Sequence, residues 1–542
     1  MKNFWKSGDP YVWITGGALM TSLLMVGGLL LLIGAKGLGF FWPADIAQMR
    51  LKDGTVLLGR ITGKEKIPSI VGDSEDRTRV HLKIGNRDLY GLDFKWVDED
   101  RIEKIEFPLG AVVLERREWG DMYAFIEDIE RDGVSLPGEE EGLWEALGGL
   151  IREARGVYSR IREIETEEIG RINYRIERKE LKIKALKLKG KGGEEWGEGR
   201  VARLEAEIEG ESALYLEKEK ELEALYRKLN ENDVVMKTAD GRSKTVPVGR
   251  IVRAYRPNAM GVLLKLGLYG SKLKEFLLDS PRESNTEGGV FPAIFGTVFM
   301  VLIMSVAVMP FGVLAAVYLA EYARPGPFVQ IVRICINNLA GVPSIVFGIF
   351  GVGFFIYGIG GTIDSFFYPE ALPTPTYGTG GILWASLTLA LLTLPVVIVA
   401  TEEGLSAVPT AVKHGSYALG ATKSETLRRV MIPTAMPGIL TGLILAIARA
   451  TGEVAPLMIT GVVKLAPTLP IDANFPYVHL DRKFMHLGFH IYDVGFQSPN
   501  VEAAKSIVYA TTLLLIAIVL VLTIFAVVIR NRLRKKYSFG EL

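Results

Sequence analysis

The sequence predicts an α-helical integral membrane protein with six transmembrane helices and an inserted extracytoplasmic α+β domain. Three observations lead to this fold class. Hydrophobic residues make up 49% of the 542 positions, but the charged residues crowd into positions 45–287. The apolar runs lie outside that stretch and are long enough to cross a bilayer at about 1.5 Å per residue. The net charge is only +1, so bulk charge indicates no nucleic-acid partner.

Residues 1–42 contain a short, weakly basic tail and the first expected transmembrane helix, over the uncharged run 14–33. A cleaved signal peptide is the competing interpretation of such a run. The run is long for a signal peptide, and no small-residue cleavage site in polar surroundings follows it. We therefore expect a retained membrane helix.

Residues 43–257 form the expected insertion. Asp53-Gly54 stands between two strand-like runs, which predicts a hairpin, and Gly85-Asn86 predicts a second turn. Strand-like alternation returns around Asp240-Gly241. We expect one small antiparallel β unit, built from residues 43–118 and 232–257.

A helical hairpin is expected between the two parts of this β unit, over residues 141–230. Apolar residues recur there at alternating steps of three and four on two helices, separated by the glycine-rich stretch 190–199. Two such stripes joined by a turn predict an antiparallel coiled coil. The basic residues between 171 and 189 could bind an acidic partner, but a solvated helical face is the simpler interpretation.

Residues 258–288 follow as an amphipathic segment that could lie on the membrane surface. The membrane domain, 289–530, contains five more apolar runs: 291–320, 329–359, 381–400, 437–463 and 507–529. A short basic tail, 531–542, ends the chain. Cys335, the only cysteine, excludes an intrachain disulfide, and its apolar surroundings predict a small core residue.

Basic residues predict the orientation of these helices. They occur at alternate ends of the spans, as the positive-inside rule requires: Arg324, Arg333, Lys413, Lys423, Arg428, Arg429 and the tail RNRLRKK. Both termini and the loop 401–433 are then expected in the cytoplasm. Residues 43–285 are expected outside a cytoplasmic (inner) membrane that the chain crosses several times.

Arg449 and Glu453 lie inside an apolar run and are four residues apart, hence on one helical face. Each charge costs roughly 2.5–3.5 kcal/mol at the centre of a membrane helix, so this helix should pack in a bundle or line a wet path. A structural ion pair is the alternative to a transport role. Pro343 and Pro456 should break their helices, and broken helices line cavities in membrane proteins. We expect the substrate pathway to contain these residues: Arg449, Glu453, Thr451, Asn337, Asn338 and Ser344.

His479, His486 and His490 lie in a polar loop, and the last two are four apart. Gly488 argues against the helix that a metal site there would need, and we expect no metal site.

The loop 401–433 carries a recognisable pattern. Gly420 is followed, after nine residues, by VMIP. This resembles the signature of ABC importer permeases, in which E-A-A, three residues, G and nine residues precede I-x-L-P. The stretches GGVFPAIFGT, NNLAGVPSIVFGIFG, SYALGAT and ARATGEVAPL resemble the A-type permease subunit of the phosphate-specific ABC transport system, over about residues 280–530. The chain departs from the signature at His414, where the family has glutamate.

The resemblance implies a type I importer permease for inorganic phosphate. It implies that a coupling loop docks into an ATPase subunit through these residues: His414, Gly415, Ser416, Tyr417, Ala418, Leu419, Gly420 and Ala421. The implied partners are a second homologous permease subunit, two ATPase subunits, an extracytoplasmic phosphate-binding protein and the lipid bilayer.

The chain itself is expected to bind no cofactor and to be no enzyme. Its glycine–lysine pairs, Gly63-Lys64 and Gly190-Lys191, lack the serine or threonine of a phosphate-binding loop. ATP and Mg²⁺ would be used by the partner ATPase. The alternatives are a permease for sulfate or molybdate, and a membrane-anchored envelope sensor or scaffold, which would not need the Gly420 loop.

Overall fold

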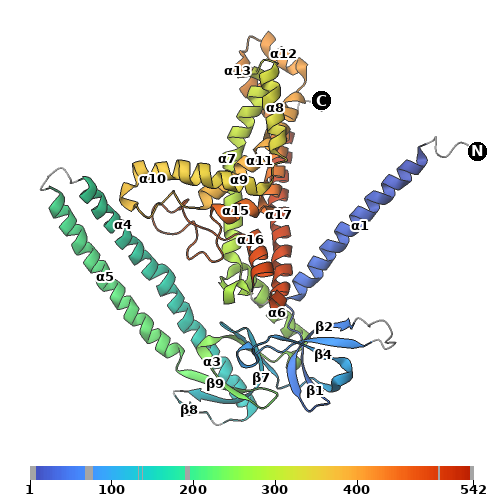
Figure 1. Cartoon of the computed structure of the whole chain (residues 1–542), viewed down its shortest axis with the longest axis vertical. Helices are drawn as coiled ribbons and strands as arrows, with labels where there is room; N and C mark the ends of the chain where they lie inside the picture. Colours follow the sequence, from blue (N-terminus) through green and yellow to red (C-terminus); the bar gives the residue numbers. More distant parts are fainter. Residues whose placement is uncertain are drawn as a thin grey trace, which may run out of the picture.

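The structure is a computed structural model that describes residues 8–67, 77–131, 133–136, 138–189, 196–498 and 501–537. Within these ranges six helical segments are long and apolar enough to cross a membrane: Asp9–Gly39, Phe291–Tyr322, Ser344–Phe367, Ile382–Ser406, Lys423–Gly452 and Val501–Lys535. Six such helices were predicted from the sequence. The model is otherwise mostly helical, with the β-strands confined to one end (Figure 1).

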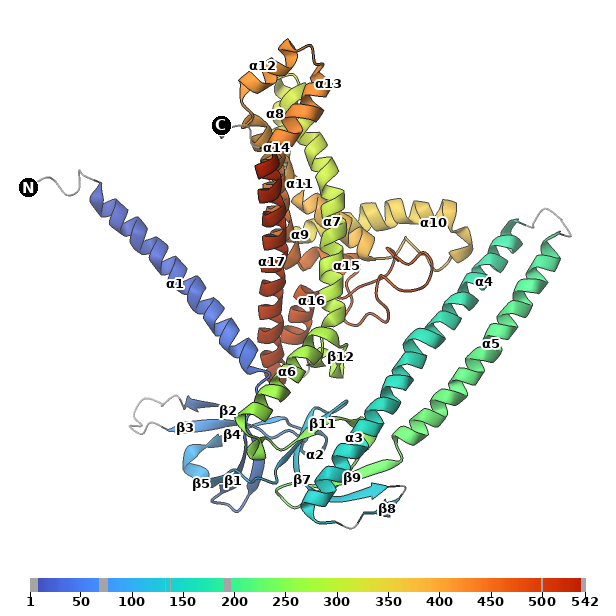
Figure 2. The same ribbon diagram turned by 180° about the vertical axis from the view of Figure 1, so that it is seen from behind.

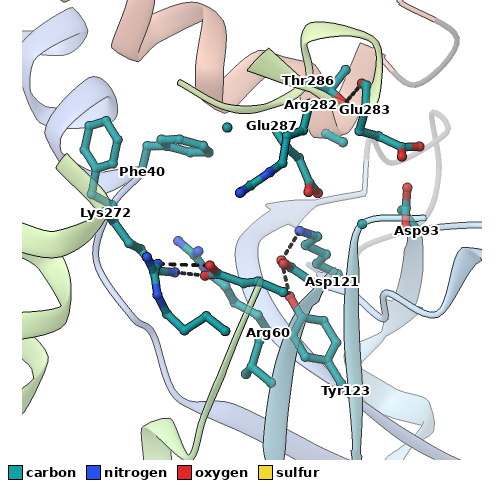
Figure 3. A pocket seen from close by; sticks show the side chains of 18 of the residues that line it. Phe40, Arg60, Asp93, Asp121, Tyr123, Lys272, Arg282, Glu283, Thr286 and Glu287 are labelled. Carbon is teal, nitrogen blue, oxygen red and sulfur yellow. Dashed lines mark hydrogen bonds and ion pairs between the residues drawn. The ribbon is translucent and has the colours of Figure 1, made fainter. Parts of the chain in front are cut away.

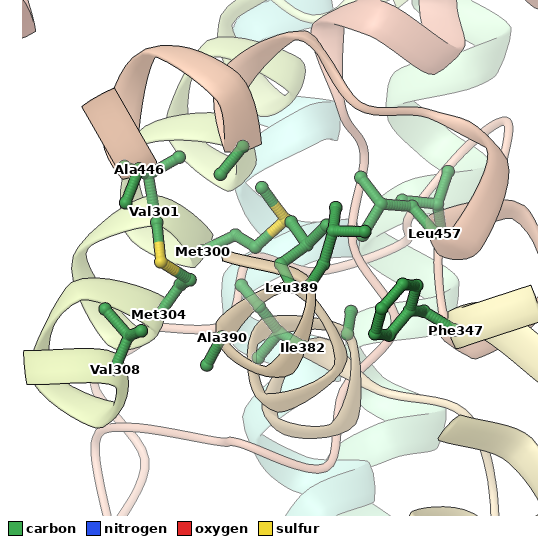
Figure 4. Packing of buried hydrophobic residues seen from close by; sticks show 14 of the residues in the cluster. Met300, Val301, Met304, Val308, Phe347, Ile382, Leu389, Ala390, Ala446 and Leu457 are labelled. Carbon is green, nitrogen blue, oxygen red and sulfur yellow. The ribbon is translucent and has the colours of Figure 1, made fainter. Parts of the chain in front are cut away.

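Four long helices form the membrane bundle (Figures 1 and 2): α7 (Phe291–Val317), α11 (Ile382–Ser406), α14 (Ile432–Gly452) and α17 (Val501–Tyr537). Their core is a cluster of apolar side chains that includes Met300, Met304, Leu389 and Ala446 (Figure 4). Small residues let α11 and α14 approach closely, since a Cβ added to Gly438 would lie 2.7 Å from the Cα of Gly404. Such small-residue contacts are typical of helix pairs in membranes.

The third apolar run was expected over 329–359 with a break at Pro343; the break is present, but the membrane-length segment runs over Ser344–Phe367, so the expected bounds were wrong. α8 (Pro327–Leu339) ends before Pro343, and α9 (Ser344–Phe350) starts directly after it. Pro343 has a ψ of 135°, which is not helical, so the two helices are separate; a proline favours such a break because it lacks an amide N–H. α9 continues through a π-helical stretch (Gly351–Gly360) into α10 (Gly361–Phe367), which lies across the bundle in Figure 1. Cys335, expected in the core, is exposed on α8.

The fifth span also differs from its expected bounds of 437–463. Helical structure runs without a gap from Lys423 to Gly452, and Pro437 lies inside α14. A single interior proline removes only one backbone hydrogen bond, which membrane helices tolerate. The helix then ends well before residue 463, because the chain leaves helical geometry at Glu453.

The insertion contains two antiparallel sheets. The first has the order β4-β3-β2-β1-β5 and is made of β1 (Ile46–Leu51), β2 (Val56–Lys66), β3 (Thr78–Lys83), β4 (Phe94–Asp98) and β5 (Ile102–Glu106). The expected hairpin between β1 and β2 is confirmed, and Gly54 takes the φ of +84° that its turn needs. At Gly85-Asn86 the chain forms a short helix, α2 (Arg87–Tyr90), instead of a tight turn.

The second sheet has the order β10-β9-β7-β6-β11, with the short β8 (Val134–Ser135) paired to β7. Its strands are β6 (Val112–Arg116), β7 (Asp121–Arg131), β9 (Asn232–Lys237), β10 (Ser243–Pro247) and β11 (Ile251–Tyr255). The expected turn at Gly241 joins β9 and β10. The sequence analysis missed β7, which pairs with β6 and with β9 and so joins the two parts of the sheet.

Asn258, near the end of the insertion, is hydrogen-bonded to the first strand of the insertion. Its side-chain oxygen accepts a hydrogen bond from the amide of Ile46 at 2.8 Å. Its side-chain nitrogen donates to the carbonyls of Ile46, at 2.9 Å, and Pro108, at 2.8 Å. The first strand of the insertion and the residues that follow its last strand are therefore tied together.

The helical hairpin consists of α3 (Glu140–Glu163), a π-helical turn (Ile164–Glu168), α4 (Ile169–Lys189) and α5 (Trp196–Leu229), which returns beside α4 (Figures 1 and 2). Most of the expected break at 190–199 lies outside the described residues, but α5 already begins at Trp196. Ion pairs cross between the helices, among them Arg160–Glu221 at 2.9 Å and Lys218–Glu168 at 2.8 Å.

Two further helices lie at the junction of the insertion and the bundle. α1 (Asp9–Gly39) diverges from the bundle toward its N-terminus (Figures 1 and 2). It meets α17 near its other end, where a Cβ on Gly37 would lie 2.9 Å from the carbonyl oxygen of Tyr509. α6 (Val262–Leu278) buries Phe276 and exposes Val262, Leu263 and Leu264, a pattern that suits a membrane interface.

Candidate functional site

Two helix breaks meet in the middle of the bundle. α14 ends at Gly452, Glu453 has an extended backbone, and α15 (Ala455–Thr460) begins with Pro456 in its first turn. Pro456 is tolerated there because the first helical amide has no intrahelical partner. α9 starts in the same way after Pro343. The two short helices pack together, since a Cβ on Gly348 would lie 2.8 Å from the Cα of Pro456.

The core cluster of the bundle supports this contact. Phe347 of α9 and Leu457 of α15 are both buried in it beside Leu389 of α11 (Figure 4). Apolar burial therefore holds both helix breaks in place. The backbone groups that lack helical partners at the breaks lie next to this packed core.

Arg449 and Glu453 lie at the break that ends α14. The Nε atom of Arg449 is 3.6 Å from Oε1 of Glu453, and the side chains are 34% and 21% exposed. The arginine occupies the last turn of α14, where the helix dipole favours a positive charge. Among the residues that the structure describes, the guanidinium makes no hydrogen bond and no other ion pair. Its remaining donors are therefore available to a solute.

Of the other residues expected on the pathway, only Thr451 lies on the same helix as Arg449, and the rest lie on α8 and α9. Thr451 is fully buried and donates its hydroxyl to the carbonyl of Ile447 at 2.7 Å, so it is satisfied within its own helix. Ser344 is partly exposed at the start of α9, and Asn337 and Asn338 are exposed on α8. In the described part of the chain, no hydrogen bond or ion pair joins these three side chains to Arg449 or Glu453.

Sequence analysis did not single out Gly348, although its position against α15 depends on its lacking a side chain. The only sequence signal is a glycine among bulky apolar residues.

The loop 401–433 forms a two-helix corner, made of α12 (Thr410–Ala418) and α13 (Lys423–Thr426). Gly420, between them, has a φ of +84° with open space around it. Thr422 and Glu425 cap α13 reciprocally: the side chain of each accepts a hydrogen bond from the backbone amide of the other. Leu419 is 90% exposed at the tip.

The corner is fixed to the π-helical extension of α7, Tyr318–Tyr322. Lys413 pairs with Glu321 at 2.6 Å, and Lys423 donates to the carbonyl of Glu321. Lys423 also lies 4.6 Å from the centre of the Tyr322 ring. His414 stays exposed on the outer surface. The result is an ordered, outward-facing corner at the end of the bundle opposite the insertion (Figure 1).

The three loop histidines take different environments. His479 lies 3.0 Å from Asp472 through its Nε2 atom. His486 is buried in front of α16 (Leu487–Tyr492), and its Nδ1 accepts a hydrogen bond from the amide of Gly488. Burial lowers the pKa of His486 to about 3. Burial also lowers the pKa of His490 to about 4, against a smaller opposing effect of Asp493.

Comparisons with known proteins match this part of the chain. The family model described as "Binding-protein-dependent transport system inner membrane component" matches residues 309–535, which include the corner and the Arg449–Glu453 pair. The phosphate transport system permease protein PstA of Mycobacterium leprae is 38% identical over 172 residues, covering 32% of this chain and 51% of the relative. The PstA protein of Yersinia pestis is 33% identical over 264 residues, covering 48% of this chain and 79% of the relative.

This chain thus spans about half the length of the Mycobacterium leprae relative. A solved structure of an inward-facing methionine ABC transporter overlaps 46% of this chain and 95% of its own, at 17% identity and a TM-score of 0.33.

Proposed function

This chain belongs to the PstA-type family of ABC permeases, and from that premise we propose that it is the membrane subunit of an importer for inorganic phosphate. The observation that carries the proposal is the Arg449–Glu453 pair, partly exposed at the helix break that ends the candidate membrane span Lys423–Gly452. Ionisable residues in membrane spans mark substrate paths more often than they serve structure alone.

The chemistry of the pair fits phosphate. The guanidinium of Arg449 offers a planar fork of donors that matches two oxygens of a tetrahedral oxyanion. The carboxylate of Glu453 can accept a hydrogen bond from the protonated oxygen of partly protonated phosphate, whereas it would repel fully ionised sulfate. The breaks before Ser344 and after Gly452 free backbone groups that can line such a path.

A continuous helix connects the proposed path to the α12–α13 corner. Helical structure extends over 30 residues from Lys423 in the corner to Gly452, beside the pair. At about 1.5 Å per residue this is a rod of about 45 Å. A displacement of the corner would therefore move Arg449 without needing any other element to transmit it.

The corner is the proposed socket for the ATPase. Two ATPase subunits would use ATP and Mg²⁺, a second permease subunit would complete the path, and an external binding protein would deliver phosphate. This chain would itself catalyse no reaction. The corner would then lie in the cytoplasm and the insertion outside an inner membrane, which agrees with their positions at opposite ends of the bundle (Figure 1).

Uptake by the reconstituted complex tests the proposal. Proteoliposomes that contain this chain, its permease partner and the ATPase should accumulate phosphate when the binding protein and ATP are supplied. Sulfate and molybdate in parallel vesicles should stay near background. Equal uptake of the three anions would indicate a general oxyanion permease, and uptake of none would favour an envelope scaffold.

A further inference from the structure

A second charged site lies far along the chain from Arg449, where the insertion meets the bundle. A cavity of about 160 Å³ lies between strands β2, β3, β7 and β11 of the insertion, α6, and the short strands β12 (Pro281–Arg282) and β13 (Glu287–Gly288). Phe40 and Phe41, at the end of α1, complete its wall. We call it the junction cavity (Figure 3).

Most charged groups of the junction cavity are paired. Lys83 lies 2.6 Å from Asp121. Arg253 contacts Glu115 at 3.0 Å and Glu275 at 2.7 Å. These pairs brace the wall, and their charges compensate one another.

Arg60 and Glu287 are the exceptions. Among the described residues, the side chain of Arg60 makes no hydrogen bond or ion pair; the residue is partly exposed, but its Nε atom is buried without a partner. Glu287 also has no ion pair there, although Figure 3 shows it beside Arg282, on the side of the cavity that faces Asp121 and Arg60. Burial, with the nearby carboxylate of Asp121, raises the pKa of Glu287 to about 8. At neutral pH the glutamate is therefore mostly uncharged.

A buried donor without an acceptor is costly, and an anion bound beside the Nε atom of Arg60 would remove that cost. We propose that the junction cavity binds a small oxyanion, with Arg60 as its charged partner and Glu287 as a hydrogen-bond partner. The volume suits such a ligand, because one water needs roughly 10–15 Å³ on this measure while drug-sized ligands need about 300 Å³ or more. An inorganic phosphate or sulfate fits, and a nucleotide does not.

The anionic group can be a free ion or the phosphate of a lipid headgroup. The second source is included because α6, which contributes Lys272 and Glu275 to the cavity, exposes apolar residues at its other end. In both cases the ligand would touch the insertion and residues 281–288 at once. That segment leads directly into α7, so occupancy would stiffen the connection between the insertion and the bundle.

Direct binding to the purified full-length chain, without ATPase or binding protein, tests this site independently of transport. Calorimetric titration with sulfate and with phosphate should show binding in the parent protein. Arg60→Gln should weaken it about tenfold or more, since a hydrogen bond to a charged group contributes about 1.5–3 kcal/mol. Arg50→Gln is the matched control, because Arg50 is exposed on the neighbouring strand β1 and outside the cavity. It should bind as the parent does.

Sulfate keeps its charge between pH 7 and 9. Any change in sulfate affinity over this range therefore arises from titration of the protein and not of the ligand. Glu287 is faced by Asp121 of β7, Lys83 of β3, Arg282 of β12 and Glu115 of β6. Ionisation of Glu287 should weaken sulfate binding as pH rises past about 8. Glu287→Gln should retain binding at pH 7 and remove most of that loss.

Two further measurements test for a lipid ligand and for binding without reliance on a variant that could misfold. If free anions do not bind, the parent and the Arg50→Gln protein should retain phosphatidylglycerol through purification, and the Arg60→Gln protein should lose it. In a Cys335→Ala background, a thiol at Ala44→Cys on the cavity wall should be alkylated more slowly when sulfate or phosphatidylglycerol is present. Equal binding by the parent and the Arg60→Gln protein, or no binding and no protection with any of these probes, would overturn the proposal.

Discussion

Gly348 lies directly against Pro456, so that a Cβ on the glycine would come within 2.8 Å of the proline Cα and of Cδ1 of Ile459. Gly348→Val should therefore separate α9 from α15 and destabilise the bundle by about 1–3 kcal/mol or more. Thermal unfolding in detergent would measure the change. Gly353→Val is the control in the same span, since nothing lies within 4 Å of a Cβ there. Equal melting of the two variants would contradict the close packing of the helix breaks.

Replacement of the Arg449–Glu453 pair should strongly reduce transport without loss of assembly. Arg449→Met combined with Glu453→Gln removes both charges, and neutral replacements of an ion pair are often tolerated structurally. Phosphate uptake by the double variant should fall by about tenfold or more, which corresponds to one lost charged hydrogen bond. Arg449→Lys keeps the charge but not the fork, and it should lose part of the uptake. Normal uptake by the double variant would remove the pair from the transport path.

Gly420 provides a test of the α12–α13 corner. Its φ of +84° costs a residue with a Cβ about 1–2 kcal/mol, although the space around it is open. Gly420→Ala should disorder the turn and reduce co-purification of the ATPase. Gly415→Ala adds the same methyl group in open space within α12, without a positive φ, and should keep the partner. Retention of the ATPase by both variants would show that the turn geometry is not needed for docking.

Acid should weaken the segment around α16. The pKa values of His486 and His490 are lowered to about 3 and about 4, so the unfolded chain binds protons more tightly than the folded one. Their contribution to stability is complete above pH 6.5, the ordinary value, and is lost as pH falls below it. Between pH 7.5 and 5 the loss should be on the order of 2 kcal/mol for each histidine.

Thermal unfolding at the two pH values measures this effect. His486→Gln should reduce the pH-dependent shift in melting temperature. His414→Gln, which changes an exposed histidine of α12, should leave the shift as it is in the parent. If the pH-dependent shift in melting temperature were the same in His486→Gln as in the parent, burial of His486 would not be the cause of the acid sensitivity.

The orientation of the chain can be checked with single cysteines. In a Cys335→Ala background, Ser135→Cys in β8 and Ser424→Cys in α13 lie at exposed positions on opposite ends of the molecule. A membrane-impermeant thiol reagent added outside intact cells should label position 135 and spare position 424. The reverse labelling would place the corner outside and exclude it as an ATPase socket.

Local signals in the sequence were sufficient for much of this structure. Asp53-Gly54 and Asp240-Gly241 predicted their hairpins because a short turn that ends in a glycine with positive φ is encoded by adjacent residues. Arg449 and Glu453 were predicted to be neighbours because residues four apart share a helical face; they do lie close together, although Glu453 is just beyond the end of α14.

Features that depend on distant segments were not predictable in this way. β7 joins strands that lie on both sides of the hairpin, so its role depends on a partner about a hundred residues away. Arg60 and Glu287 each resemble ordinary surface residues in the sequence, and only the packing of β2 against the β12–β13 segment brings them to one cavity. Gly348 likewise gains its importance from Pro456, in another helix.

The hydrogen bonds of Asn258 have a consequence for the history of this gene. They join two points that are 212 positions apart, so everything between them leaves and re-enters the bundle at one place. Loop-closure entropy grows only slowly with length, and a short turn could connect the same two helices at little extra free energy. The segment could therefore have been acquired, or could be lost, in a single in-frame event that leaves the permease domain intact.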